Sequence, residues 1–199
     1  MGYLGDVRAT DPLIAMHTHP DAFNREAAAH GLAELISFHR HDLRIIDSLL
    51  AALKDEAPKV RELAARGLGY TYTMDDADKS HPIDLRVVDA LIAALNDQDG
   101  GTVREAAHSL VNLPDARAVE PLLKTVQKHH AFWKDPKLAS DKRRMARRIA
   151  LSAIYALGAT GDRRAIGPLI ALVDGQGLVN ESELTISQQA VRALENSTG

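Results

Sequence analysis

Three histidines have the residue types and the spacing of a metal site. His39, His41 and His81 fall on turns that we expect at one edge of a helical array, and an acidic segment, 75–78, precedes the last of them. Imidazole and carboxylate groups would suit zinc or a similar ion. Solvated turn histidines explain the same pattern, and they are the interpretation that we adopt. We therefore expect no metal and no cofactor.

A second group of residues is cationic. Residues 128–148 contain eight Lys or Arg and two Asp, a net charge of +6, whereas the whole chain carries −3. Several of these cations crowd the start of a predicted helix, where positive charge opposes the helix dipole. Three interpretations remain open: a solvated face paired with acids of the next repeat, an acidic protein surface, and nucleic acid. The cations that we select as candidate contacts are Lys142, Arg143, Arg144, Arg147 and Arg148.

Phe132 and Trp133 lie beside this cationic run in a chain that is only 4% aromatic. Trp is the residue most enriched among binding hot spots. Either the two rings contact a partner protein, or they fold over nearby helix ends and anchor a connection. We include both as candidate partner-binding residues.

The residue sets of other catalytic or ligand-binding sites are missing from the sequence. The chain has no cysteine, which excludes a disulfide framework, a thiol nucleophile and a thiolate metal site. We assign no Ser-His-Asp set and no paired carboxylates in a defined cleft. Glycine-rich turns such as 158–161 end helices rather than begin them, so they are poor phosphate binders. We therefore predict that the protein is not an enzyme.

A short pattern recurs along the chain and defines its organisation. Each copy places Asp two residues before Arg, followed by apolar residues at helical spacing. The Asp can accept hydrogen bonds from the free N–H groups of a helix start, and self-similarity at such intervals marks a repeat array. The five copies begin at Asp6, Asp42, Asp84, Asp115 and Asp162.

An alanine-rich helix precedes each of the later Asp residues, as in 24–32, 60–68, 103–110 and 149–157. Small side chains let two helices approach closely, and a single helix pair cannot bury its apolar faces. We take the alanine-rich helix as the first of each repeat and the Asp-initiated helix as the second. The second helices are then expected to line a concave face.

We expect two insertions in this array. Residues 72–82 lengthen the turn inside a repeat, and residues 131–140 lengthen a connection between repeats. The predicted helices span residues 7–16, 22–36, 42–54, 58–70, 84–96, 102–113, 116–129, 141–158, 163–173 and 183–196.

The repeated residues resemble a known family. The run Val-Arg-x-x-Ala, Leu-Gly, Gly-Asp-x-Arg-Ala-Ile-x-Pro-Leu-Ile is similar to the HEAT-like repeat named after the phycobilin lyases, most closely at 149–170. This resemblance implies an all-α, right-handed α-solenoid of the HEAT or armadillo type, with about five stacked hairpins and half-repeats at both ends. It is specific for architecture and unspecific for function.

Related repeat proteins supply two tests of chemistry. The iron-binding hydroxylases of this superfamily use His-Glu dipeptides, and none occurs here. The HEAT-like DNA glycosylases use several aromatic residues and an acid, whereas this chain has one Trp. With its net charge of −3, the chain also has no global nucleic-acid signature.

Composition is consistent with a continuous helical core, since 45% of residues are hydrophobic. No apolar run approaches membrane-spanning length, and the start lacks the order of a signal peptide. We predict a soluble, cytoplasmic protein in which residues 1–199 form one repeat array. The half-repeats at its ends favour an excised piece of a longer protein, or else end-to-end association between chains.

We predict a scaffold that binds another protein, one with an acidic surface, on the concave face and on the 131–148 segment. The first alternative is a subunit resembling the phycobilin lyases, which handle a tetrapyrrole and its acceptor protein. The second is a structural spacer within a longer chain.

Overall fold

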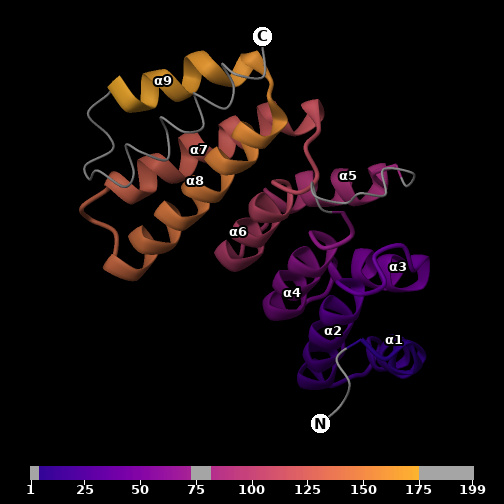
Figure 1. The fold of residues 1–199 in the computed structure, drawn as a ribbon. Coiled ribbons are helices and arrows are strands. Elements are labelled where there is room, and N and C mark those ends of the chain that lie inside the picture. Colours follow the sequence, from indigo (N-terminus) through magenta and orange to yellow (C-terminus); the bar gives the residue numbers. More distant parts are fainter. Residues whose placement is uncertain (1–4, 73–81, 175–199) are drawn as a thin grey trace. The chain divides into compact units, whose positions relative to one another are not determined.

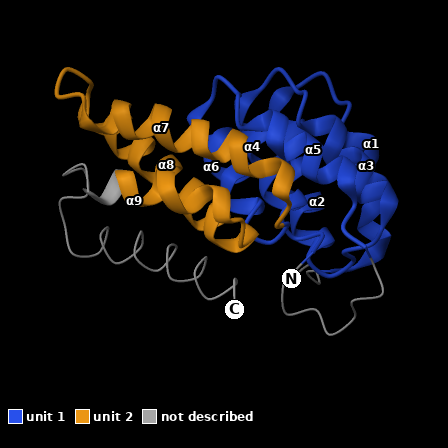
Figure 2. Cartoon of the chain, turned by 90° about the horizontal axis from the view of Figure 1, so that it is seen from above, with its two compact units in different colours: residues 1–113 blue, residues 114–199 orange. Residues whose placement is uncertain are grey.

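The computed structural model describes residues 5–72 and 82–174. Over these residues the chain is helical throughout and contains no strand (Figure 1). It forms two compact units, residues 1–113 and residues 114–199 (Figure 2). The expectation of one array over residues 1–199 stays a prediction.

Unit 1 holds a short 3-10 turn followed by six helices, and unit 2 holds two 3-10 turns and three helices among the described residues. The elements of unit 1 are η1 (Val7–Ala9), α1 (Thr10–Met16), α2 (Ala22–Ile36), α3 (Leu43–Ala52), α4 (Pro58–Leu68), α5 (Leu85–Ala94) and α6 (Gly100–Ser109). Those of unit 2 are η2 (Ala116–Ala118), α7 (Val119–Lys134), α8 (Ser140–Thr160), η3 (Arg163–Ala165) and α9 (Ile166–Asp174). The predicted helix at 183–196 lies outside the described residues.

The five repeated Asp residues cap helical segments, as the sequence predicted. Each carboxylate accepts a hydrogen bond from the backbone N–H two residues later and also binds the guanidinium of that same Arg. At Asp6, Asp115 and Asp162 the capped segment is a 3-10 turn, and the α-helix follows it. Pro12 and Pro121 therefore lie in the first α-helical turn, where a missing N–H costs no helix hydrogen bond.

The frame that we predicted for the repeat is one of two ways to divide the same succession of helices into hairpins. Connections of the same length, residues 17–21, 53–57, 95–99 and 135–139, join α1 to α2, α3 to α4, α5 to α6 and α7 to α8. In the second way, each hairpin begins with the Asp-initiated helix and ends with the alanine-rich one, and residues 72–82 lie between hairpins. In the predicted frame the same residues lie within a repeat.

Unit 1 has two layers, visible in Figure 1 as one row of α2, α4 and α6 and another of α1, α3 and α5. The alanine-rich helices pack directly on one another, while the other row is looser. A Cβ added at Gly67 of α4 would lie 2.9 Å from Ala33 of α2, so the small side chains set this spacing. In a curved stack the tighter layer lies inside. The prediction that the Asp-initiated helices line the concave face is therefore wrong for unit 1.

Two arginines, Arg25, which is buried, and Arg61, which is half-buried, hold the turns of unit 1 together. Arg25 of α2 binds Asp55 of the next hairpin's turn through Nε and Nη2, at 2.7 and 3.0 Å, and Arg61 of α4 binds Asp97 in the same way, at 2.8 Å for both bonds. Each Nη1 donates to carbonyl groups of the turn that precedes its own helix. This arginine ladder links each hairpin of unit 1 to the next.

Unit 2 is built around the long hairpin of α7 and α8. The prediction of an inserted connection at 131–140 is wrong, because α7 continues to Lys134 and α8 begins at Ser140. Leu122, Ile149 and Leu157 are almost completely buried between these helices and their neighbours. Both helices are therefore longer than the corresponding helices of unit 1, and they extend the hairpin toward the turn at 135–139.

Candidate partner-binding site

The free end of the α7–α8 hairpin brings the predicted aromatic and cationic residues together. Phe132 and Trp133 lie in the last turn of α7, and Lys142, Arg143 and Arg144 lie in the first turns of α8. The turn between the helices is short, and Asp135 Oδ1 caps it by accepting from the Lys137 N–H at 2.9 Å. We call residues 128–148 the hairpin tip.

Trp133 is held on the hairpin by one guanidinium and one imidazole. The Arg147 guanidinium of α8 lies 5.7 Å from the centre of its ring, within the range of a cation–π contact. His130, one turn earlier on α7, meets the indole edge-on at 5.8 Å. The ring thus contacts both helices while remaining partly exposed. It is ordered by the hairpin before any partner arrives.

Phe132 points to another side of α7 and is 44% exposed. It meets His129 edge-on, with ring centres 5.8 Å apart. His129 is 8% exposed, and neither ring nitrogen has a hydrogen-bond partner within the described part of the chain. Burial lowers the pKa of His129 to about 4, and the neighbouring Lys128 adds to this effect. The imidazole is therefore neutral at physiological pH.

Four cations of the first turns of α8 have no acidic partner within the described part of the chain. Lys142, Arg144 and Arg148 are exposed, Arg143 is half-buried, and none of the four has a carboxylate within ion-pair distance among residues 5–72 and 82–174. Asp141 is the only acid in the first turn of α8. The interpretation that these cations pair with acids of a neighbouring repeat finds no support among those residues.

The candidate histidine site is not assembled by the part of the chain that the structure describes. There, no three His, Asp or Glu side chains are grouped so as to hold a metal ion. His39 donates its Nε2–H to the Gly5 carbonyl at 2.7 Å, which fixes that ring in a structural role. His81 lies outside the described residues.

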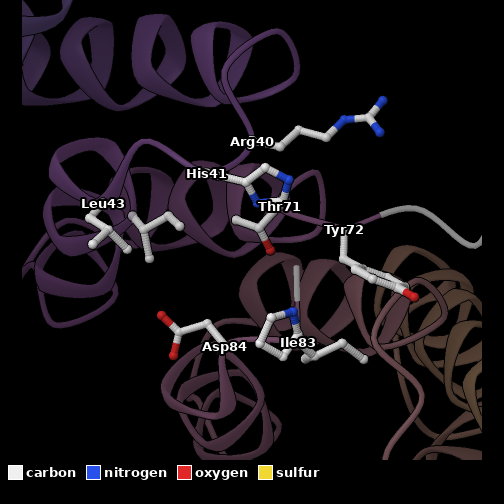
Figure 3. Close-up of a pocket in the computed structure, with 9 residues that line it drawn as sticks. Arg40, His41, Leu43, Thr71, Tyr72, Ile83 and Asp84 are labelled. Atoms are coloured by element: carbon white, nitrogen blue, oxygen red, sulfur yellow. The ribbon is translucent and has the colours of Figure 1, made fainter. Parts of the chain in front are cut away.

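His41 instead lines a pocket of about 280 Å³ in unit 1, between the α2–α3 connection and the residues on either side of segment 73–81 (Figure 3). Two polar lining groups already have partners. The Thr71 hydroxyl donates to the Leu68 carbonyl at 2.8 Å, and Asp84 caps α5 and binds Arg86. Sequence analysis did not find this pocket, because residues 41 and 84 meet only in the fold.

No helix among the described residues is long and apolar enough to span a membrane. This finding agrees with the absence of a long apolar run in the sequence.

Family models match two stretches of the chain. The HEAT repeats model covers residues 46–133, and the PBS lyase HEAT-like repeat model covers residues 149–175. The chain is a HEAT-repeat protein. No curated protein has significant sequence similarity to it.

Solved structures share the fold at low identity. A chain of the CpcE–CpcF complex of phycocyanin lyase from Nostoc sp. PCC7120 has a TM-score of 0.70 and 23% identity, covering 94% of this HEAT-repeat chain and 65% of that one. An engineered protein has a TM-score of 0.64 and 18% identity, covering 96% and 81%. A designed armadillo repeat protein in complex with the peptide (KR)4 has a TM-score of 0.64 and 16% identity, covering 94% and 82%.

At these identities the likeness shows the fold alone, an all-α solenoid of the HEAT and armadillo type. This HEAT-repeat chain spans a little under two thirds of the length of the phycocyanin lyase chain. The lyase activity is therefore a property of that protein.

Proposed function

We propose that this HEAT-repeat protein is a non-enzymatic scaffold and that the hairpin tip binds the acidic surface of a partner protein. The observation that carries the proposal is a set of four cations beside an ordered Trp133 that have no acidic partner in residues 5–72 and 82–174, namely Lys142, Arg143, Arg144 and Arg148. Desolvated aromatic anchors surrounded by complementary charge are typical of protein interfaces.

The helical positions of these residues support the proposal further. Binding groups on rigid helices lose less conformational entropy than those on loops. Phe132 and Trp133 had been expected on a loop, but both are in the last turn of α7. The inner layer of unit 1, formed by α2, α4 and α6, is the second surface that we assign to partner binding.

A lyase-like subunit that handles a tetrapyrrole is the second candidate. The match of the PBS lyase HEAT-like repeat model at residues 149–175, together with the fold of the phycocyanin lyase chain, favours it. Titration with a bilin distinguishes the two candidates. A saturable shift of the bilin absorbance would favour the lyase-like function over the scaffold.

The test of the scaffold is affinity capture with the full chain, followed by identification of the captured proteins. Arg143→Glu with Arg147→Glu should remove the partner and flatten the salt dependence of capture, since such charges steer association. Lys54→Glu with Lys124→Glu is the matched control, because both lysines are exposed and lie outside the hairpin tip. The control variant should retain the partner.

Trp133→Ala should weaken the affinity for the identified partner by about 2 kcal/mol or more, roughly thirtyfold in Kd. Tyr155→Ala, which removes a 45% exposed aromatic ring from α8, should leave it unchanged. Melting temperatures are measured beside the affinities. If Trp133→Ala lowers the stability by several kcal/mol while capture survives, the ring only anchors the hairpin and the proposed site is wrong.

A further inference from the structure

A groove of about 410 Å³ lies on the inner layer of unit 1, between α2 and α4. The groove runs parallel to both helices, because the residues that line it occupy equivalent positions on α2 and on α4. Phe23 and Lys59 are the second residues of α2 and α4, and His30 and Arg66 are the ninth. Seven residues of helix separate these two ends, which is about 10 Å along the axis.

Phe23 forms the apolar end of the groove. It is 75% exposed, the largest fraction among the large hydrophobic side chains that the structure describes. Asp21 caps α2 by accepting from the Phe23 N–H at 3.0 Å, so the ring projects from a fixed helical turn. Leu63, which is 3% exposed, continues the apolar lining toward the middle of the groove. A large aromatic ring that is exposed to solvent beside a groove is typical of a contact site for a partner's apolar side chain.

Arg66 forms the other end, and its charge is poorly compensated. Its Nε and Nη2 atoms have no hydrogen-bond partner among the described residues, and Glu34 Oε1 lies 3.6 Å from Nη2. These two nitrogens are buried, but the side chain as a whole is 31% exposed and Nη1 is not among its buried atoms, so an incoming group can meet Nη1. By contrast, Lys59 is already bound to Glu62 at 3.0 Å. A carboxylate at the Arg66 end would accept a charge-assisted hydrogen bond from Nη1.

We propose that this groove binds a short extended segment of a partner protein that carries a large apolar side chain and an Asp or Glu about three residues apart. At roughly 3.3 Å per residue, three extended residues span the distance between the two ends. The apolar side chain packs on Phe23 and Leu63, and the carboxylate accepts from Arg66. This inference rests on the proposed scaffold function and names the partner chemistry for its inner layer.

The first test is selection of random heptapeptides displayed on phage against the full chain. Enriched peptides should share an apolar residue and an acid two to three positions apart. Failure to enrich any peptide, or enrichment of peptides without an acid, would overturn the proposal.

The second test measures the Kd of one enriched peptide by fluorescence polarisation. Phe23→Ala and Arg66→Gln should each weaken binding about tenfold or more, and Arg66→Lys should restore only part of the loss because the planar fork is absent. Replacing the peptide's acid by its amide should weaken binding equally, with no additional loss in Arg66→Gln. Additive losses would show that the carboxylate does not meet Arg66 and would overturn the pairing.

Phe38→Ala and Lys54→Gln are the matched controls, since both side chains are exposed in unit 1 and lie outside the groove. Neither should change the Kd, and equal losses in these controls would refute the site. The hairpin-tip variants separate this inference from the proposed function. If they abolish capture of an acidic partner while no heptapeptide binds the groove, the scaffold stands and the groove assignment fails.

Discussion

In unit 1 the hairpin turns at 53–57 and 95–99 present Asp55 and Asp97 to arginines of the preceding hairpin. In unit 2 the corresponding turn at 135–139 is followed by four cations, Lys142, Arg143, Arg144 and Arg148, that have no acidic partner among the described residues. The sequence charges differ accordingly, with a net −7 over residues 1–113 and +4 over residues 114–199. The same hairpin geometry thus serves internal cohesion in one unit and presents an open cationic surface in the other.

The difference lies in where each arginine's acceptors are. Arg25 and Arg61 point along the stack and meet carboxylates and carbonyl groups of adjacent turns. Arg25 uses all five of its N–H donors in this way, and Arg61 uses four. At the hairpin tip, four cations of α8 are bound to no carboxylate of the described residues. The following predictions either test this contrast or sharpen it.

The largest effect is expected from the core of unit 2. Leu157 is fully buried, so Leu157→Ala should lower the free energy of unfolding by about 2–5 kcal/mol. Hydrogen exchange locates the loss. In a continuous repeat array, lost protection spreads through nearest-neighbour interfaces and should reach helices of unit 1. Changes confined to residues 141–173 would count against one array over the whole chain.

Removal of ladder arginines should affect folding more than removal of cap arginines. Arg25 and Asp55 have side chains 9% and 8% exposed, whereas Arg44 and its partner Asp11 are 54% and 79% exposed. A buried carboxylate left without its partner is costly, while an exposed pair is worth little. Arg25→Ala should therefore depress the melting temperature clearly more than Arg44→Ala. Equal shifts would contradict the role given to the ladder.

His129 gives unit 2 a dependence on pH. Its pKa is about 4 when folded and near 6.5 when unfolded, so the unfolded state takes up the proton first as the pH falls. Stability contributed by the neutral ring is complete above pH 6.5 and is lost as the pH falls toward 4. His129→Leu should reduce this loss and raise stability at neutral pH by about 1 kcal/mol, since a buried group without partners is replaced by an apolar one. Chemical unfolding at pH 7.5 and pH 5 measures both effects, and an unchanged pH dependence would show that another group controls it.

The smallest effect is expected at two of the candidate histidines, for which we expect no metal binding. His39→Ala with His81→Ala should leave the response of the melting temperature to added zinc unaltered, because His39 already donates to the Gly5 carbonyl. The measurement is thermal unfolding with and without zinc. A zinc-dependent rise in melting temperature that the double variant abolishes would restore the metal site.

Much of the architecture could be predicted from the sequence, because it depends on local chemistry. The Asp-x-Arg pattern determined where helical segments start, since the carboxylate of Asp42 or Asp84 needs only the N–H groups two residues away. The apolar spacing and the alanine-rich helices determined that hairpins would stack, and the resemblance to HEAT-like repeats was confirmed. The candidate residues from Phe132 to Arg148 were also selected from sequence, and their role in binding stays a prediction.

Only the tertiary structure decided which layer of helices is the inner one. Local patterns do not specify which row packs more tightly, and the close approach of Gly67 to Ala33 places the alanine-rich helices in that row. The same holds for the ladder, the groove and the hairpin tip. Arg25 and Asp55 are 30 residues apart in the sequence, and Phe23 and Arg66 are separated by more residues still. Trp133 contacts Arg147 only because α7 and α8 extend together. Contacts of that kind are determined by packing, which periodicity alone does not specify.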